Sequence, residues 1–513
     1  MERVTGFDAA FLALETPTMH MHIAAVMVFE PGDDGAGPEP AAVQFQRLRQ
    51  LVSERLHLVP PLRRRVVRVP FGLHHPVWLE DPDFDLDYHL RRAHLPAPGG
   101  PAELQAFVAD VAGRPLDPQR PLWEMHLVEG LDSGHTALVV KIHHAAIDGT
   151  SGAEVLATFL DLGPVPRAVP APIRPWRPEP IPTEAEMLTW AATSLVRQPE
   201  RAFSALRRTV GAVRDLADHN RRLRAEHELS PPPAPFSAPR SSLNGAISAH
   251  RRFAMAEMAL DDVRLVKDVF GGTVNDVVLA VVSGALRRLL GGRGEDVDAS
   301  LVAFVPISSR TEADRGKLGN KVSGMLVSLA STVEDPVERL WAVSAASQVA
   351  KEQARALPEE LLHTWAQLAA PAVSSRVARL SANMRVFDRV RPLFNVVVSN
   401  IAGPDASLWC AGSRMVALYP MGPLIEGVGL NVTVASYDTT VFFGALGCRE
   451  LVPEVEYVTE YLEDALGELV KAASRGTIHR GRGSGRAYGR RRRHPSERPW
   501  WLAPFEDRTD ADR

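Results

Sequence analysis

The stretch that decides the fold is residues 137–142, Ala-Leu-Val-Val-Lys-Ile, followed directly by His143-His144-Ala145-Ala146-Ile147-Asp148-Gly149. The first six residues are mostly apolar, and apolar runs of this length are typical of a buried strand. Because successive strand residues face opposite sides, one histidine should point into the domain and the other away from it. Gly149 suits a turn with positive φ. Asp148 is placed to fold back on that turn or to pair with a buried cation.

A histidine directly after a strand suits acyl transfer to a hydroxyl group, in which the hydroxyl proton must leave as the oxygen attacks. An imidazole titrates near neutral pH, and a positioned general base contributes ~10²–10⁴-fold to such a reaction. For a His-His dipeptide alone, a structural pair that caps the strand is the simpler interpretation. A zinc site at His143 and His144 is not expected, since no third ligand follows at metal spacing.

Working outward, two proline-rich stretches divide the chain. Residues 163–183 hold eight prolines, and residues 231–239 are rich in proline again. Such segments form neither helix nor central strand and are typical of extended linkers. We therefore expect a first domain over 1–162, a crossover over 163–240, a second domain over 241–474 and a tail over 475–513.

Both domains are predicted to mix strands and helices. In the first domain, strands are expected at 21–30, 125–129 and 137–142, and helices at 41–57 and 150–160. In the second domain, strands are expected at 301–305, 394–399, 427–435 and 440–446. The segment 274–290 is apolar on nearly every side, which predicts a buried helix. A terminal helix follows from the apolar spacing between residues 458 and 469.

Bulk properties exclude several classes of protein. The 513 residues are 45% hydrophobic and 23% charged, as in ordinary globular proteins of two to four domains. The net charge of -4 gives no general attraction to nucleic acid. Two distant cysteines, Cys410 and Cys448, form neither a disulfide framework nor a zinc pattern, which favours the cytoplasm. No secretory signal and no run of ~18 apolar residues is visible.

Two basic segments are candidates for contact with a lipid surface. Residues 475–498 hold nine arginines and one acidic residue, Glu497, which predicts a disordered tail. Such a tail either binds anionic headgroups or is merely solvated. Residues 203–216 combine an apolar helical stripe with arginines. Simple packing against the domains is the favoured interpretation, and membrane contact is the alternative.

The string His143 to Gly149 resembles the HHxxxDG motif of the superfamily of chloramphenicol acetyltransferase, carnitine acyltransferases and peptide condensation domains. Further segments, in order, resemble the bacterial wax ester synthase/diacylglycerol acyltransferase family over residues 1–474. They are Asp8-Ala9-Ala10-Phe11-Leu12, Glu15-Thr16-Pro17-Thr18-Met19-His20-Met21-His22, Phe84-Asp85-Leu86-Asp87-Tyr88-His89, Pro121-Leu122-Trp123, Asn275-Asp276, and Ser399-Asn400-Ile401-Ala402-Gly403-Pro404.

The resemblance implies an α/β fold of two chloramphenicol-acetyltransferase-like sandwiches, with the active-site tunnel between them. It implies that His144 is the general base, while His143, Asp148 and Gly149 shape the site. The expected substrates are a long-chain acyl-CoA and diacylglycerol or a long-chain alcohol, with no bound cofactor and no metal. The enzyme would be cytoplasmic and peripherally attached to a membrane or to lipid inclusions. A polyketide- or glycolipid-directed acyltransferase, or a non-catalytic lipid-binding protein, is the alternative.

The remaining motifs each have two interpretations. Pro121, Leu122 and Trp123 are expected to pack at the start of a strand, where a tryptophan buries a large area; the alternative is contact with the substrate. Asn275 and Asp276 either cap a helix or bring Asn275 into the tunnel as an oxyanion donor. Ser399, Asn400 and Gly403 form a turn by default, or they line the tunnel.

Overall fold

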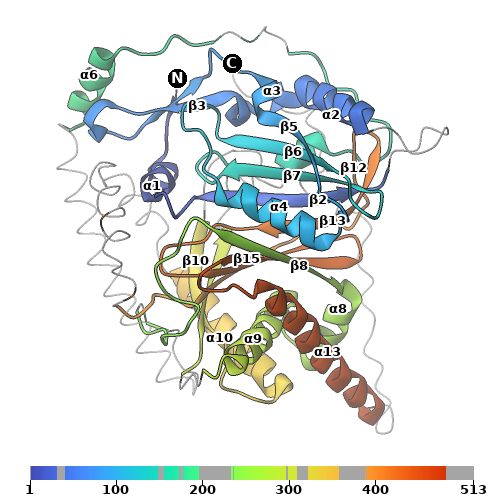
Figure 1. The fold of residues 1–513 in the computed structure, drawn as a ribbon. Helices are drawn as coiled ribbons and strands as arrows, with labels where there is room; N and C mark the ends of the chain where they lie inside the picture. Colours follow the sequence, from blue (N-terminus) through green and yellow to red (C-terminus); the bar gives the residue numbers. More distant parts are fainter. Residues whose placement is uncertain are drawn as a thin grey trace.

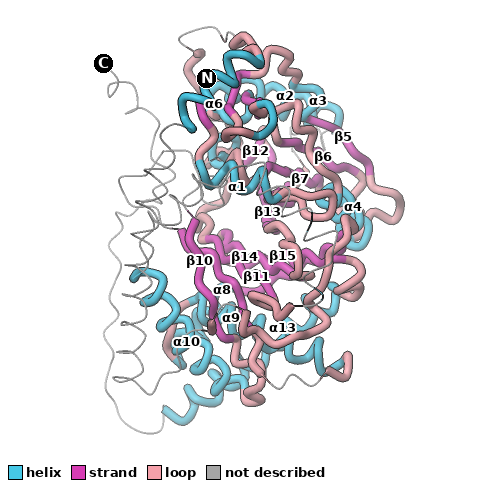
Figure 2. Tube along the Cα trace, turned by 90° about the vertical axis from the view of Figure 1, so that its left-hand side faces the viewer, coloured by secondary structure: helices cyan, strands magenta, loops and turns pink. Residues whose placement is uncertain are grey.

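The computed structural model describes residues 2–31, 41–147, 155–172, 176, 178–195, 233–234, 236–295, 299–308, 322–356, 380, 388 and 390–480. Two six-stranded sheets dominate the described chain and lie one above the other (Figures 1 and 2). The mixed α/β class predicted from the sequence is therefore confirmed.

The first sheet has the strand order β12-β13-β2-β7-β6-β5. Its strands are β2 (His22–Phe29), β5 (Leu90–His94), β6 (Trp123–Glu129), β7 (Thr136–His143), β12 (Trp409–Cys410) and β13 (Ser413–Met421). All eight residues of β7 are buried, as the apolar run predicts. β7 pairs antiparallel with β2 and β6, and His22 lies directly opposite His143.

The first sheet includes two strands from beyond the predicted first domain. β12 and β13 belong to the residues assigned to the second domain, but β13 pairs antiparallel with β2 and so completes the first sheet. Which strands pair depends on contacts between residues far apart in the sequence. The positions of proline-rich linkers carry no information about such contacts. The two halves are thus joined by an exchanged hairpin as well as by the crossover.

The first half is completed by helices and a small sheet, and Figure 1 labels the helices and β3 of that sheet. The helices are α1 (Gly6–Leu14), α2 (Ala41–Arg55), α3 (Leu86–His89), α4 (Pro101–Gly113) and α6 (Glu184–Leu195). Three short 3-10 turns cover Leu56–Leu58, Pro60–Arg63 and Pro70–Gly72. The small sheet contains β1 (Glu2–Arg3), β4 (Val77–Glu80) and β3 (Arg64–Val67).

The second sheet has the order β10-β9-β11-β14-β15-β8. Its strands are β8 (Arg251–Ala259), β9 (Val302–Ser308), β10 (Val322–Ser328), β11 (Val396–Ile401), β14 (Leu430–Tyr437) and β15 (Thr440–Cys448). Four helices cover its outer face: α8 (Leu260–Phe270), α9 (Val274–Gly292), α10 (Pro336–Ala356) and α13 (Val455–Arg480) (Figure 1). α9 is buried almost throughout, as its apolar sequence predicts.

The inner face of the second sheet packs against the first half. Phe253 of β8 and Leu446 of β15 join the same hydrophobic core as Trp123 and Met27. The two layers approach each other closely at Gly444, where an added Cβ would lie 2.0 Å from the carbonyl oxygen of Pro420 in β13. Only a residue without a side chain allows this approach of two backbones.

The ends of the predicted elements differ in places from the structure. α13 continues to Arg480, so the first six residues of the predicted disordered tail are helical. The rest of the tail and the basic segment 203–216 lie outside the described residues. Among the described residues, no single helix is long and apolar enough to cross a membrane. α8 and α9 meet the combined test of length and apolar composition only as a pair, and they are bent by 102° at their junction.

Candidate active site

The backbone at the end of β7 is held from both sides. The N–H of His143 donates to the carbonyl of Leu122 at 2.9 Å, and the N–H of His144 donates to the carbonyl of Met21 at 2.7 Å. The chain then turns, because the N–H of Ala146 donates to the carbonyl of His143 at 2.9 Å. The segments preceding β6 and β2 therefore position the histidine pair.

The two histidines face different surroundings, as strand alternation predicts. His143 is buried, with 1% of its surface exposed, whereas His144 is half-buried. The ring of His144 stacks on Phe11 of α1 at 4.3 Å between ring centroids, with 24° between the planes. α1 is fixed at its start by Thr5, whose hydroxyl donates to Asp8 at 2.6 Å and accepts from the Asp8 N–H. Helix α1, which carries the N-terminal motif, therefore packs beside the candidate base.

His143 lies in a cluster of imidazoles around Glu15. Its ring meets that of His22 edge to face at 5.7 Å, and His22 stacks on His20 at 5.4 Å. Glu15 Oε2 lies 3.8 Å from His143 Nε2, and Glu15 Oε1 lies 3.6 Å from His22 Nε2. Burial, together with the neighbouring His22, lowers the pKa of His143 to about 3, so its ring is neutral at physiological pH.

Lys141 lies two residues before His143 on the same face of β7, and it is fully buried. Its ammonium contacts Glu124 Oε1 at 2.7 Å and donates to the carbonyls of Val111 and Arg114 at 2.8 and 2.9 Å. These carbonyls end α4, where a cation is favoured. Burial opposes the charge on Glu124, but His126 and Lys141 lower the pKa of Glu124 to about 2.

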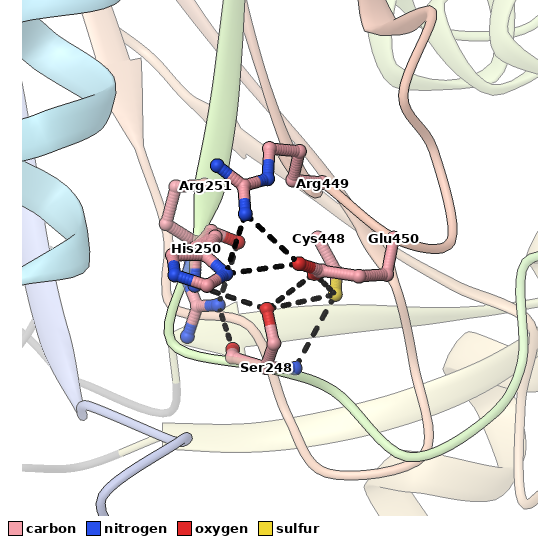
Figure 3. A network of polar contacts seen from close by, with 6 residues as sticks. All are labelled: Ser248, His250, Arg251, Cys448, Arg449 and Glu450. Atoms are coloured by element: carbon pink, nitrogen blue, oxygen red, sulfur yellow. Dashed lines mark hydrogen bonds and ion pairs between the residues drawn. The ribbon is translucent and has the colours of Figure 1, made fainter.

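The loop before β2 reaches across to the second half. Arg251 Nη2 donates to the carbonyl of Thr18 at 2.6 Å, and the Thr18 hydroxyl donates to Glu426 at 3.3 Å. Figure 3 shows the polar network that holds Arg251 in place. Arg251 donates to the Ser248 carbonyl, and the Ser248 hydroxyl donates to Glu450 beyond the end of β15. Arg251 also lines a small cavity with His20 and His22, which follow Thr18 along the chain. The histidine cluster therefore lies at the junction of the two halves.

Ser399 lies on β11 of the second sheet, and the neighbouring strand β14 contacts the segment that follows β13. Ser399 of β11 lies opposite Thr433 of β14, whose hydroxyl accepts from the N–H of Gly422 at 2.9 Å. Gly422 in turn lines a small cavity together with His20 and His22. Asn400 lies half-buried beside Ser399 on the same strand. Gly403 makes a close backbone approach, because an added Cβ would lie 1.8 Å from the Ser436 carbonyl oxygen.

Asp276 has a structural position at the start of α9. Thr273 is the N-cap, its hydroxyl accepts from the Asp276 N–H at 3.3 Å, and the Asp276 carboxylate accepts from the Thr273 N–H at 2.8 Å. This reciprocal pair is a capping box. The same carboxylate accepts from Ser344 of α10 at 3.3 Å. Asn275 is half-buried in the first turn of the helix.

The segment Pro121-Leu122-Trp123 packs at the start of β6, and all three residues are buried. Trp123 stacks on His89, which stacks on Phe84, with 4.5 and 5.4 Å between ring centroids. The Trp123 indole donates to the Leu62 carbonyl at 2.7 Å. Two sequence motifs therefore meet in one aromatic stack, and the carbonyl of Leu122 links this stack to His143.

Asp148 and Gly149 lie outside the described residues, so their predicted roles stay predictions. Among the residues that the structure describes, no three His, Cys, Asp or Glu side chains are arranged to hold a metal ion.

Reading the sequence alone missed Glu15, His22, Lys141 and Arg251 as parts of the site. His20 and His22 stand two residues apart at the start of a predicted strand, so a shared face was visible. What the sequence did not show is that this strand pairs with the one that ends at His143.

Two family models match this chain. The model of the wax ester synthase/diacylglycerol acyltransferase catalytic domain matches residues 4–278, and that of the WS/DGAT C-terminal domain matches residues 318–470. A Mycobacterium tuberculosis protein named diacylglycerol O-acyltransferase is 34% identical over 475 residues, covering 92% of this chain and 91% of that protein. A second one is 37% identical over 445 residues, covering 85% and 90%.

Among solved structures, the wax ester synthase/diacylglycerol acyltransferase from Marinobacter aquaeolei VT8 is similar, with a TM-score of 0.65 and 28% identity. The match covers 92% of this chain and 100% of that one. The starter condensation domain of rhizomide synthetase shares the fold, with a TM-score of 0.52, 15% identity, and 92% and 94% of the two chains covered. The chain therefore belongs to the wax ester synthase/diacylglycerol acyltransferase family.

Proposed function

We propose that the chain is an O-acyltransferase that moves a long-chain acyl group from acyl-CoA to diacylglycerol or to a long-chain alcohol. The products are triacylglycerol or wax ester and free coenzyme A. One observation carries the proposal: the half-exposed imidazole of His144 sits on a turn whose backbone is fixed by Leu122 on one side and Met21 on the other. Fixed geometry of this kind is what a general base requires.

In the proposed reaction, His144 takes the hydroxyl proton as the acceptor oxygen attacks the thioester carbonyl carbon. The C–O bond forms, negative charge develops on the carbonyl oxygen, and the C–S bond then breaks. The thiolate of coenzyme A leaves and receives the proton from the imidazolium. His143 shapes the turn, and Asp148 and Gly149 are proposed to complete it. Asn275, Ser399 and Asn400 are candidates for contacts along the substrate path.

The names of the relatives support the acceptor class. The related M. tuberculosis proteins are named for diacylglycerol, and the similar M. aquaeolei enzyme for wax ester and diacylglycerol. For the donor, the rhizomide synthetase domain was solved with C8-CoA, and we propose a coenzyme A thioester here as well.

A direct assay tests this function. Purified protein is given radiolabelled palmitoyl-CoA with diacylglycerol in one arm and hexadecanol in the other, and lipid products and free thiol are both measured. We expect labelled ester in at least one arm, in equal amount to the released thiol. Thiol release without ester in both arms would instead indicate a hydrolase, and no release in either arm would contradict the proposed donor.

Both acceptors are nearly insoluble in water, so we further propose that the enzyme collects them at an anionic lipid surface through its arginine-rich tail. Seven of the nine arginines between residues 475 and 498 follow Arg480, where α13 ends. Each basic residue near such a surface contributes ~1 kcal/mol at low salt. Truncation after Arg480, which leaves α13 whole, should reduce sedimentation with phosphatidylserine vesicles.

Binding by the full chain should weaken as salt rises, because the Debye length falls to ~3 Å at 1 M. A matched control keeps the length of the tail and replaces Arg490, Arg491, Arg492 and Arg493 by serine. It should bind more weakly than the full chain and more strongly than the truncated protein, because it keeps Arg482, Arg486 and Arg498. Equal sedimentation of all three proteins at every salt concentration would rule out the tail as the anchor.

A further inference from the structure

The histidine cluster next to His144 contains buried imidazole nitrogens without hydrogen-bond partners. His22 and His143 are buried, with 6% and 1% of their surfaces exposed. Both ring nitrogens of His22 and Nε2 of His143 have no hydrogen-bond partner among the described residues. Buried polar atoms in folded proteins are nearly always paired, so unpaired ones call for an explanation.

Glu15 is placed to provide the missing partner. It lies at the end of α1, and its side chain is 22% exposed. One carboxylate oxygen faces each ring: Oε1 is 3.6 Å from His22 Nε2, and Oε2 is 3.8 Å from His143 Nε2. Both distances exceed a hydrogen bond by about 0.7–0.9 Å. Contacts of this length in unliganded catalytic sites often shorten when substrate binds.

The hydrogen bonds of His143 determine which of its nitrogens carries the proton. Nδ1 of His143 accepts from the N–H of Ala145 at 3.0 Å. The ring is neutral, so its single proton is on Nε2, the nitrogen that faces Glu15. A Glu15 carboxylate that accepts this proton would favour the same tautomer. The ring orientation would then keep Nδ1 aimed at the Ala145 N–H, inside the turn that carries His144.

The small cavity beside the cluster offers a partner for the remaining nitrogen of His22. It is lined by His20, His22, Lys141 and Arg251 among others, and its volume of about 10 Å³ is close to what a single water needs. A water there would have imidazole nitrogens as partners. Lys141 and Arg251 disfavour a third positive charge in the same place, since both lower the pKa of His22 and His20, after burial itself.

We propose that Glu15 and His22 are positioning residues of the acyl-transfer site: Glu15 accepts N–H groups from both His22 and His143, and so fixes the His143–Ala146 turn that presents His144. The catalytic role of Glu15 and His22 rests on the proposed function. The effect of Glu15 on the tautomer of His143 does not depend on that function. Glu15 and His22 act through His143 and need not touch either substrate.

Three variants test the proposal. Glu15→Gln keeps the shape, but its amide accepts from only one ring at a time. His22→Phe keeps the ring and its stacking but removes both nitrogens, whereas His22→Gln keeps an N–H group near the position of Nε2. We expect Glu15→Gln and His22→Phe to lower kcat about 10-fold or more with KM within about twofold, and His22→Gln to recover most of the loss.

A second measurement needs no substrate. NMR of protein labelled with ¹⁵N-histidine should show His143 protonated on Nε2 in the wild type. In Glu15→Gln the share of the Nδ1-protonated tautomer should rise, because only the Ala145 N–H is then left to favour the Nε2 tautomer. Wild-type kcat in both Glu15→Gln and His22→Phe would overturn the proposal, as would a lowered kcat with the His143 tautomer unchanged. If the wild-type protein transfers no acyl group, the proposed function fails, but the tautomer experiment still decides whether Glu15 holds His143.

Discussion

Replacement of His144 by alanine is expected to lower kcat by about 10² or more, because a general base typically contributes ~10²–10⁴-fold. The fold should survive the change. His144 is half-buried in a turn, and its backbone hydrogen bond to Met21 does not involve the side chain. The packing lost includes the stack on Phe11. Steady-state kinetics with palmitoyl-CoA, together with a thermal melt, measure both expectations.

His94→Ala is a matched control for this experiment. His94 is exposed at the end of β5, the edge strand farthest along the sheet from β2. Its removal deletes an imidazole from the same half without touching the turn, so turnover should stay at the wild-type level. Turnover of the His144→Ala protein within a fewfold of the wild type would exclude His144 as the base.

Replacement of Lys141 by methionine is expected to lower the free energy of unfolding by about 3–5 kcal/mol. The change removes three polar contacts at once: the ion pair with Glu124 and the bonds to the Val111 and Arg114 carbonyls. The Glu124 carboxylate would then lie mostly buried beside His126 without its cation. The end of α4 would lose the cation that binds its last carbonyls. Urea unfolding, followed by circular dichroism, measures the loss.

The double variant Lys141→Met, Glu124→Gln separates the two causes. Removing both charges should restore part of the lost stability, because most of the cost of breaking a buried ion pair comes from the charge left behind. If the double variant is no more stable than Lys141→Met alone, the unpaired Glu124 is not the cause, and the bonds to the end of α4 carry the effect.

Local pattern predicted most of the secondary structure close to the candidate base. The apolar run at 137–142 became β7 over Thr136–His143, and the all-round apolar segment 274–290 became α9 over Val274–Gly292. These predictions succeed because the burial of an element determines the spacing of its apolar residues, and this spacing can be read from the sequence. The predicted tail begins six residues before α13 ends, because residues 475–480 are rich in arginine and glycine and lie beyond the apolar spacing of residues 458–469.

The sequence by itself determined the strand that ends in two histidines, their opposite orientations, the helices with continuous apolar faces, and the family. Only the tertiary structure decided that β13 completes the first sheet, that His22 faces His143, and that Glu15 lies between them. The physical reason is the range of the interactions. Periodicity and capping act between residues a few positions apart. The hydrogen bonds between β2 and β7 bring residues 22 and 143 opposite each other, and they leave no mark in either segment alone.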